Sequence, residues 1–125
     1  MSKKKILIVD DEIELVELVK IRLETSGYEV ITANSGLEGL AKAAGELPDL
    51  IVLDIGMAEM DGYSTLQKLK GEEKTKDIPV IMLTAYAKMK SLFEMEGISD
   101  YIVKPFDPQD FLARVDKVLR KKKGK

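Results

Sequence analysis

The chain contains no cysteine, no histidine and no tryptophan. Without cysteine there is no thiol nucleophile, no Cys-based zinc site and no disulfide framework. Without histidine there is no serine-histidine triad, no histidine metal ligand and no phosphohistidine donor within the chain. Any chemistry must therefore use carboxylates, lysine, threonine, tyrosine or the backbone.

A long apolar run and a strong net charge are also missing. No apolar segment approaches the roughly 20 residues that span a bilayer, and no signal-peptide core follows the lysine-rich start. The net charge is −2, and the basic residues at the two ends, 3–5 and 121–125, flank an acidic body. Lysines at chain ends are usually solvated tails. We expect a cytoplasmic protein without direct nucleic-acid or membrane partners.

The length and composition favour one globular domain. The sequence has 125 residues, of which 45% are hydrophobic and 34% are charged. A chain of this size buries roughly two-thirds of its unfolded surface and needs neither a metal nor a disulfide to fold. We expect a single domain over residues 1–125, with a basic tail at about 121–125.

Five short β-rich segments alternate with segments of helical periodicity. The strands are expected at 5–10, 28–33, 50–53, 78–83 and 101–103. Apolar stripes between them predict the first three helices, at Leu15, Val16, Leu18, Val19 and Leu23, then at Leu37, Leu40, Ala41 and Ala44, then at Tyr63, Leu66 and Leu69. Strands that read as continuous apolar runs between helices indicate an α/β fold whose parallel sheet is covered on both faces, in five βα units.

Local signals mark several helix ends. Ser35 with Glu38 forms a capping box before the second helix. A short fourth helix is predicted around Met89, Leu92 and Phe93, ending before Gly97, which suits a left-handed position after a helix. Asp107 and Pro108 predict the start of the last helix.

Chemically useful side chains gather at the carboxyl ends of the predicted strands. Asp10 and Asp11 follow the first strand, Asp54 the third, Thr84 the fourth and Lys104 the fifth. Ligands of such sheets bind beyond these strand ends. Each residue alone also has a structural explanation; Asp11, for example, is suited to capping a helix.

Three carboxylates at one place repel one another unless a cation lies among them. Oxygen ligands without His or Cys favour Mg²⁺, or Mn²⁺, over zinc. A divalent ion beside a lysine and a threonine hydroxyl neutralises the oxygens of a phosphoryl group in transfer. Asp54 is the best candidate nucleophile, because Asp10 and Asp11 form a pair suited to holding the metal.

This arrangement resembles the receiver domain of two-component response regulators. The motifs that carry the resemblance occur in order along the chain, as Asp10-Asp11, Asp54 within LDIGMAEMDG, Thr84-Ala85 and Lys104-Pro105-Phe106. The resemblance implies a flavodoxin-like, doubly wound sheet in the order 2-1-3-4-5. It also implies that Asp54 is the phosphoacceptor, that the carbonyl of Gly56 is a further Mg²⁺ contact, and that Thr84 and Lys104 bind phosphoryl oxygens.

The resemblance further implies partners and a switch. A sensor histidine kinase or a histidine phosphotransfer protein would donate the phosphoryl group, and a changed surface would then act on a downstream protein. Tyr101 matches the family's switch aromatic, which swings inward as the threonine hydroxyl moves. The first helix carries apolar residues over a wide arc, so Leu15 and Leu18 are candidate docking residues for the kinase. Pro105 and Phe106 are two further candidates.

The sequence departs from the family at a few positions. Ala58 stands where proline is usual, Gly56 where a side chain is usual, and the segment 84–104 is about two residues short. Gly56 has no side chain to orient a hydrolytic water, and the Tyr86 ring is suited to covering the phosphoryl group. We therefore expect a long-lived phosphoaspartate.

Two other functions use similar residues. A haloacid dehalogenase-type phosphatase also has an aspartate nucleophile and Mg²⁺, but it requires an acid at the Gly56 position and usually a cap domain. A degenerate receiver would bind partners without phosphorylation. The chain retains every reactive residue, which argues against that alternative, and we expect no enzyme activity beyond phosphorylation and dephosphorylation of the chain itself.

Overall fold

Five parallel strands form one sheet in a computed structural model that describes residues 3–54, 62–85, 94 and 97–123. The strand order is β2-β1-β3-β4-β5, as the family resemblance implied. The strands are β1 (Lys5–Val9), β2 (Glu29–Ala33), β3 (Leu50–Asp54), β4 (Val80–Thr84) and β5 (Asp100–Val103). The order reverses between β1 and β3, where sheets of this class bind their ligands.

The strand boundaries differ from the predicted ones by one or two residues. The largest difference is at β4, which begins at Val80 and not at residue 78. Pro79 has no N–H to donate to a neighbouring strand, and the N–H of Ile78 bonds to the carbonyl of Thr75 in a preceding turn. Every residue of β3 and β4 is buried, as expected for strands covered on both faces.

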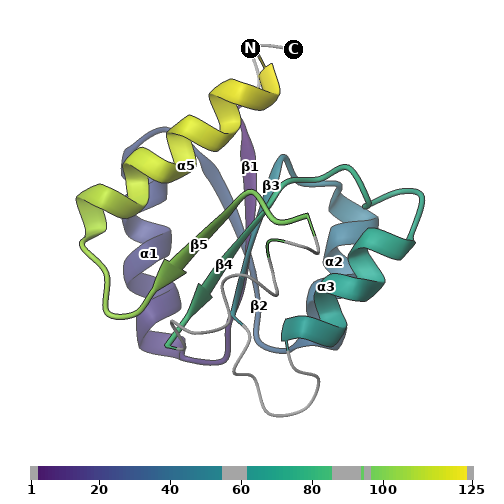
Figure 1. Cartoon of the computed structure of the whole chain (residues 1–125). Coiled ribbons are helices and arrows are strands. Elements are labelled where there is room, and N and C mark those ends of the chain that lie inside the picture. Colours follow the sequence, from purple (N-terminus) through teal and green to yellow (C-terminus); the bar gives the residue numbers. More distant parts are fainter. Residues whose placement is uncertain (1–2, 55–61, 86–93, 95–96, 124–125) are drawn as a thin grey trace.

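Helices pack on both faces of the sheet, as Figure 1 shows. Helices α1 (Ile13–Thr25) and α5 (Pro108–Lys123) cover one face, and α2 (Gly36–Glu46) and α3 (Gly62–Gly71) cover the other. Each pair closes its own hydrophobic cluster against the sheet. Within the described ranges, no helix combines the length and apolar character that crossing a membrane requires.

The predicted ends of the helices are largely confirmed. Ser35 caps α2 by accepting a hydrogen bond from the Glu38 N–H at 3.2 Å, although the Glu38 carboxylate bonds back to the N–H of Asn34 and not to that of Ser35. α5 begins at Pro108, and Gly97 has the left-handed φ of +87°. The helix expected around Met89, Leu92 and Phe93 lies outside the described residues.

The predicted buried face of α2 is wrong. Leu37 is 61% exposed and Ala41 and Ala44 are also exposed, whereas the buried residues are Gly36, Gly39 and Ala43. Glycine and alanine let the helix backbone approach the sheet closely, so this face packs inward and the larger leucine points to solvent. Only Leu40 of the predicted stripe contributes, as a half-buried neighbour of the cluster.

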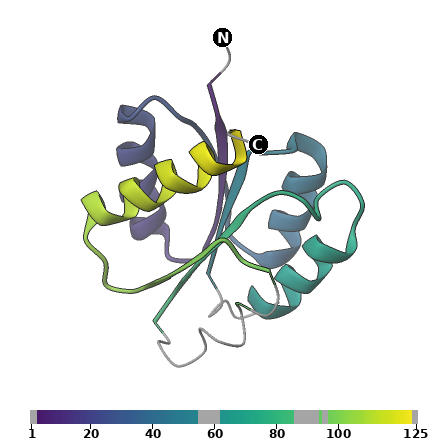
Figure 2. The ribbon, with the colours of Figure 1, turned by 45° about the horizontal axis from the view of Figure 1, so that its top comes forward.

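The carboxyl ends of the strands lie at one edge of the molecule. The arrows of β4 and β5 point to this lower edge in Figure 1. The last turn of α5 lies beside the amino-terminal end of β1 at the opposite edge (Figure 1, Figure 2). The sequence therefore delivers the end residues of all the strands to one place, far from the end of α5.

Candidate functional site

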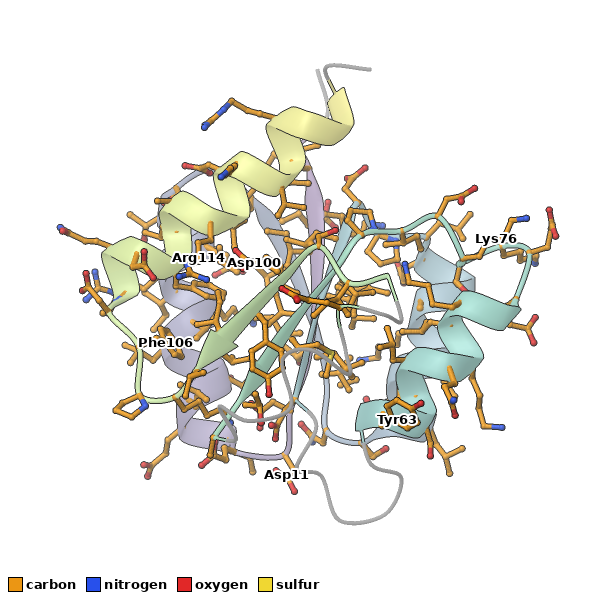
Figure 3. The ribbon with its side chains drawn as sticks, in the orientation of Figure 1. Asp11, Tyr63, Lys76, Asp100, Phe106 and Arg114 are labelled. Carbon is orange, nitrogen blue, oxygen red and sulfur yellow. The ribbon has the colours of Figure 1, made fainter. Side chains whose placement is uncertain are left out.

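Three carboxylates meet at the carboxyl edge of the sheet. Asp10 follows β1, Asp54 ends the neighbouring β3, and Asp11 lies at the lower edge in Figure 3. One oxygen from each lies within 4.8 Å of the others. Asp10 and Asp54 are 1% and 6% exposed, whereas Asp11 is exposed. The structure thus brings together the three acids that the sequence predicted to hold a metal.

The turn into α1 fixes the Asp10 carboxylate. The Asp10 N–H donates to the carbonyl of Ala33 on β2 at 3.1 Å, and one carboxylate oxygen accepts from the N–H of Glu12 at 3.0 Å. The residue that caps α1 is Glu12, whose side chain makes no capping hydrogen bond. Asp11 is therefore not the cap of this helix.

Lys104 brings a positive charge to these acids. Its N–H donates to the carbonyl of Thr84 at 2.7 Å, which anchors the residue beside the end of β4. Its Nζ lies 3.1 Å from an Asp10 oxygen and 3.7 Å from an Asp54 oxygen. The peptide bond to the following Pro105 is cis.

The pKa of Lys104 is raised by its surroundings. Burial lowers the pKa of this ammonium, but a hydrogen bond to Glu12 and the charges of Asp10 and Asp54 outweigh burial. The side chain is only 16% exposed. Lys104 is therefore charged at neutral pH and places a cation beside the acidic cluster.

Glu12 belongs to the site, and the sequence analysis missed it. Its Oε1 lies 2.6 Å from Lys104 Nζ, the shortest of the three ion pairs that the lysine makes with described residues. The available signal was the run of three acids, Asp10-Asp11-Glu12, of which only the first two were interpreted. Because the chain turns after Asp10, the side chain of Glu12 lies beside Lys104.

Thr84 and Tyr101 lie at the adjacent strands. Thr84 ends β4 and is fully buried, and its backbone pairs with Val103 of β5. Tyr101 is 5% exposed and belongs to the hydrophobic cluster on the α2 and α3 side. The tyrosine thus already occupies an interior position.

The donor set fits a hard divalent cation. Three carboxylates offer only oxygen atoms, which are the preferred ligands of Mg²⁺ and Mn²⁺. The exposed Asp11 leaves the cluster open on one side, so that waters or a phosphoryl oxygen can complete the coordination.

Comparison with known proteins identifies the family. The model of the response regulator receiver domain matches residues 6–116. The chain belongs to this family. The CheY-like response regulator receiver domain protein of Methanospirillum hungatei superimposes with a TM-score of 0.91 at 36% identity, over 98% of each chain. The match favours a receiver domain over the phosphatase alternative.

Other similar proteins include longer transcriptional regulators and a response regulator solved as a complex. The DNA-binding dual master transcriptional regulator RpaA of Synechocystis is 43% identical over 119 residues, which cover 94% of this chain and 49% of RpaA. The chain spans about half the length of the curated relatives it matches. The response regulator TrrA of Thermotoga maritima, solved with Mg²⁺ and BeF, has a TM-score of 0.83 at 37% identity, over 91% of this chain and 97% of TrrA.

The docking candidates of this receiver domain have different environments. Leu18 is 50% exposed, whereas Leu15 is half-buried against the core. Two exposed residues of α1 were not singled out from the sequence, Ile13 at 65% and Ile21 at 58%. With about 3.6 residues per turn, Leu18 and Ile21 fall on the arc opposite the buried residues of the helix, whereas Ile13 is one turn from the buried Val16 and lies at the edge of that arc.

The residues after Lys104 are only partly accessible. Pro105 is exposed, but the Phe106 ring is half-buried and lies 5.2 Å from the ring of Phe111, centroid to centroid. Phe106 therefore packs on α5 in this structure. Gly56 and Tyr86, the positions linked to metal contact and hydrolysis, lie outside the described residues, as does Ala58.

Proposed function

We propose that Asp54 of this receiver domain accepts a phosphoryl group from a phosphohistidine on a sensor histidine kinase or a histidine phosphotransfer protein. The P–N bond to the donor imidazole breaks and a P–O bond to the Asp54 carboxylate forms. The observation that carries this proposal is the buried Asp54 carboxylate, clustered with two further acids and 3.7 Å from the Lys104 ammonium.

Each side chain has a distinct part in the proposed transfer. Asp10, Asp11, Asp54 and the carbonyl of Gly56 would hold Mg²⁺, or Mn²⁺, which neutralises phosphoryl oxygens when bound. Lys104 would contact a second phosphoryl oxygen. Burial of the Asp54 carboxylate strengthens these charge interactions.

The same charges would drive the change in shape. The Thr84 hydroxyl would move to a phosphoryl oxygen and alter the space that the Tyr101 ring occupies. Because the ring is already interior in this structure, the alternative state of the switch is the one with the ring outward. The two states would then differ in direct contacts with the phosphoryl group, which a population shift requires.

The partners follow from this surface. The exposed apolar residues of α1, Ile13, Leu18 and Ile21, are the proposed contact for the donor protein, together with Leu15 of the same helix and Pro105 after Lys104. The downstream target is a protein, or a further domain of the same protein.

The absence of direct nucleic-acid binding stays a prediction for these residues only, because RpaA is named a DNA-binding regulator. A cytoplasmic location fits a kinase partner.

The decisive experiment is labelling with a small-molecule phosphodonor. We expect a phosphoryl adduct by intact-mass analysis in Mg²⁺ and none in EDTA, because an anionic donor must approach a cluster of anions. Asp54→Asn should abolish the adduct, and Asp11→Asn should raise the Mg²⁺ concentration that is required.

Asp49→Asn is a matched control for the loss of one carboxylate. Asp49 directly precedes β3, at the opposite end of the strand from Asp54, and its carboxylate accepts from the N–H of Lys5 at 2.8 Å. This variant should label as the wild type does. Undiminished labelling of Asp54→Asn would show that another residue is the acceptor.

A further inference from the structure

Lys104 is shared between Asp10, a member of the acidic metal cluster, and Glu12, which lies outside that cluster. The ammonium hydrogen-bonds to Glu12 at 2.6 Å and to Asp10 at 3.1 Å, and its distance of 3.7 Å to Asp54 exceeds hydrogen-bond length. Among the residues that the structure describes, the carboxylate nearest to the lysine is thus that of Glu12, which lies outside the metal cluster.

The contact with Glu12 draws the ammonium toward the rim of the site. The Glu12 side chain is 58% exposed, whereas that of Asp54 is 8% exposed. An ammonium has three N–H donors, and Glu12 and Asp10 take two of them in this structure. When Asp10 turns its oxygens to a bound cation, Glu12 remains as the competitor for the lysine.

The backbone at Glu12 places its carboxylate where it can compete for the Lys104 ammonium. Glu12 occupies the capping position of α1 with extended dihedrals (φ −86°, ψ 96°), and its N–H is held by Asp10 at 3.0 Å. Because its carboxylate does not cap the helix, it is free to pair with the lysine. Lys104 is 92 residues away in the chain and is itself anchored to Thr84.

We propose that Glu12 is a positioning residue that holds the Lys104 ammonium away from Asp54 in the unphosphorylated protein. The inference rests on the proposed function, since it assumes that Lys104 binds the phosphoryl group. A phosphoryl group on Asp54 must then displace Glu12 as the ion-pair partner of the Lys104 ammonium. Glu12 opposes the phosphorylated state by the free energy of that ion pair.

The test measures the response to beryllofluoride, a phosphoryl mimic, at saturating Mg²⁺ by amide NMR of the whole chain. Glu12→Gln removes the charge with little change in shape, and Glu12→Asp keeps the charge but shortens its reach. Both variants should saturate at a lower beryllofluoride concentration than wild type. The expected difference is roughly two- to five-fold, the range that exposed ion pairs supply.

Two controls separate position from net charge. Glu14→Gln removes an exposed acid from the first turn of the same helix without touching Lys104, and its midpoint should equal that of wild type. In a Lys104→Gln background, Glu12→Gln should no longer shift the midpoint, because the partner of the ion pair is gone. Mg²⁺ affinity, titrated without beryllofluoride, shows whether a variant acts through the metal.

Several results would overturn the inference. Unchanged or weaker beryllofluoride binding in Glu12→Gln would show that the glutamate does not compete for the lysine. Tighter binding in Glu12→Gln with wild-type binding in Glu12→Asp would assign the effect to net charge alone. A wild-type chain without a saturable response would refute the proposed function itself, which is a different outcome from a response that no variant changes.

Discussion

Gly39 allows α2 to approach closely the strand that leads into the acidic cluster. A Cβ atom at this position would lie 2.8 and 2.9 Å from the two Cγ atoms of Val9. Val9 is 1% exposed and pairs with Ala33 on one side and Leu53 on the other. The χ1 angle of a β-branched side chain is restricted, so Val9 has little freedom to move its methyl groups aside. Gly39→Ala must therefore displace the helix or the strand.

The size of the effect follows from two opposing contributions. Overpacking a buried position costs about 1–3 kcal/mol, while replacing glycine by alanine within a helix stabilises by about 0.5–1 kcal/mol. Gly45, in the same helix, has open space where a Cβ would lie, with no atom within 4 Å, and shows only the favourable contribution on substitution by alanine. The free energies of unfolding of Gly39→Ala and Gly45→Ala should therefore differ by about 1–3 kcal/mol.

Urea unfolding followed by circular dichroism measures this difference directly. We expect Gly45→Ala at or above the stability of wild type and Gly39→Ala below both. In a thermal scan, each kcal/mol corresponds to roughly 4 °C in a chain of this size. Equal stability of the two variants would show that the close approach of α2 to Val9 is not a constraint, and would refute the explanation given for the buried face of this helix.

Two other contacts make separate predictions. Burial and a hydrogen bond to Asp116 raise the pKa of Tyr28 to about 12. The stability that this contact contributes to the folded state should therefore be retained below the unfolded pKa of about 10 and lost as the pH rises toward 12. Tyr28→Phe should remove this alkaline dependence of the free energy of unfolding. The buried Thr75 hydroxyl donates to the carbonyl of Leu69 at 2.7 Å. Thr75→Val should therefore lower the free energy of unfolding by about 1–3 kcal/mol, whereas Thr75→Ser should retain most of the wild-type stability. A Thr75→Val variant as stable as wild type would show that the carbonyl finds another partner.

The sequence was sufficient to predict the type and order of the elements that the structure describes. Apolar runs such as Leu50–Asp54 and helical stripes such as Val16, Val19 and Leu23 are local patterns, and the local period reports the local structure. Parallel strands place their carboxyl ends at one edge, so Asp10, Asp54 and Lys104 could be assigned to one site before any coordinates. The order of the strands, by contrast, came from the family resemblance and not from the pattern.

Only the tertiary structure decided which helix faces are buried and which distant side chains pair. The leucines of α2 outweigh its glycines on any hydrophobicity scale, yet Gly39 faces Val9 because a close helix-sheet approach is a property of two elements together. The division of α1 into a half-buried Leu15 and an exposed Leu18 depends likewise on where α5 packs. The pairing of Glu12 with Lys104 joins residues 92 positions apart, and its 2.6 Å distance results from the turn after Asp10 and the anchoring of Lys104 at Thr84, neither of which leaves a periodic signal in the sequence.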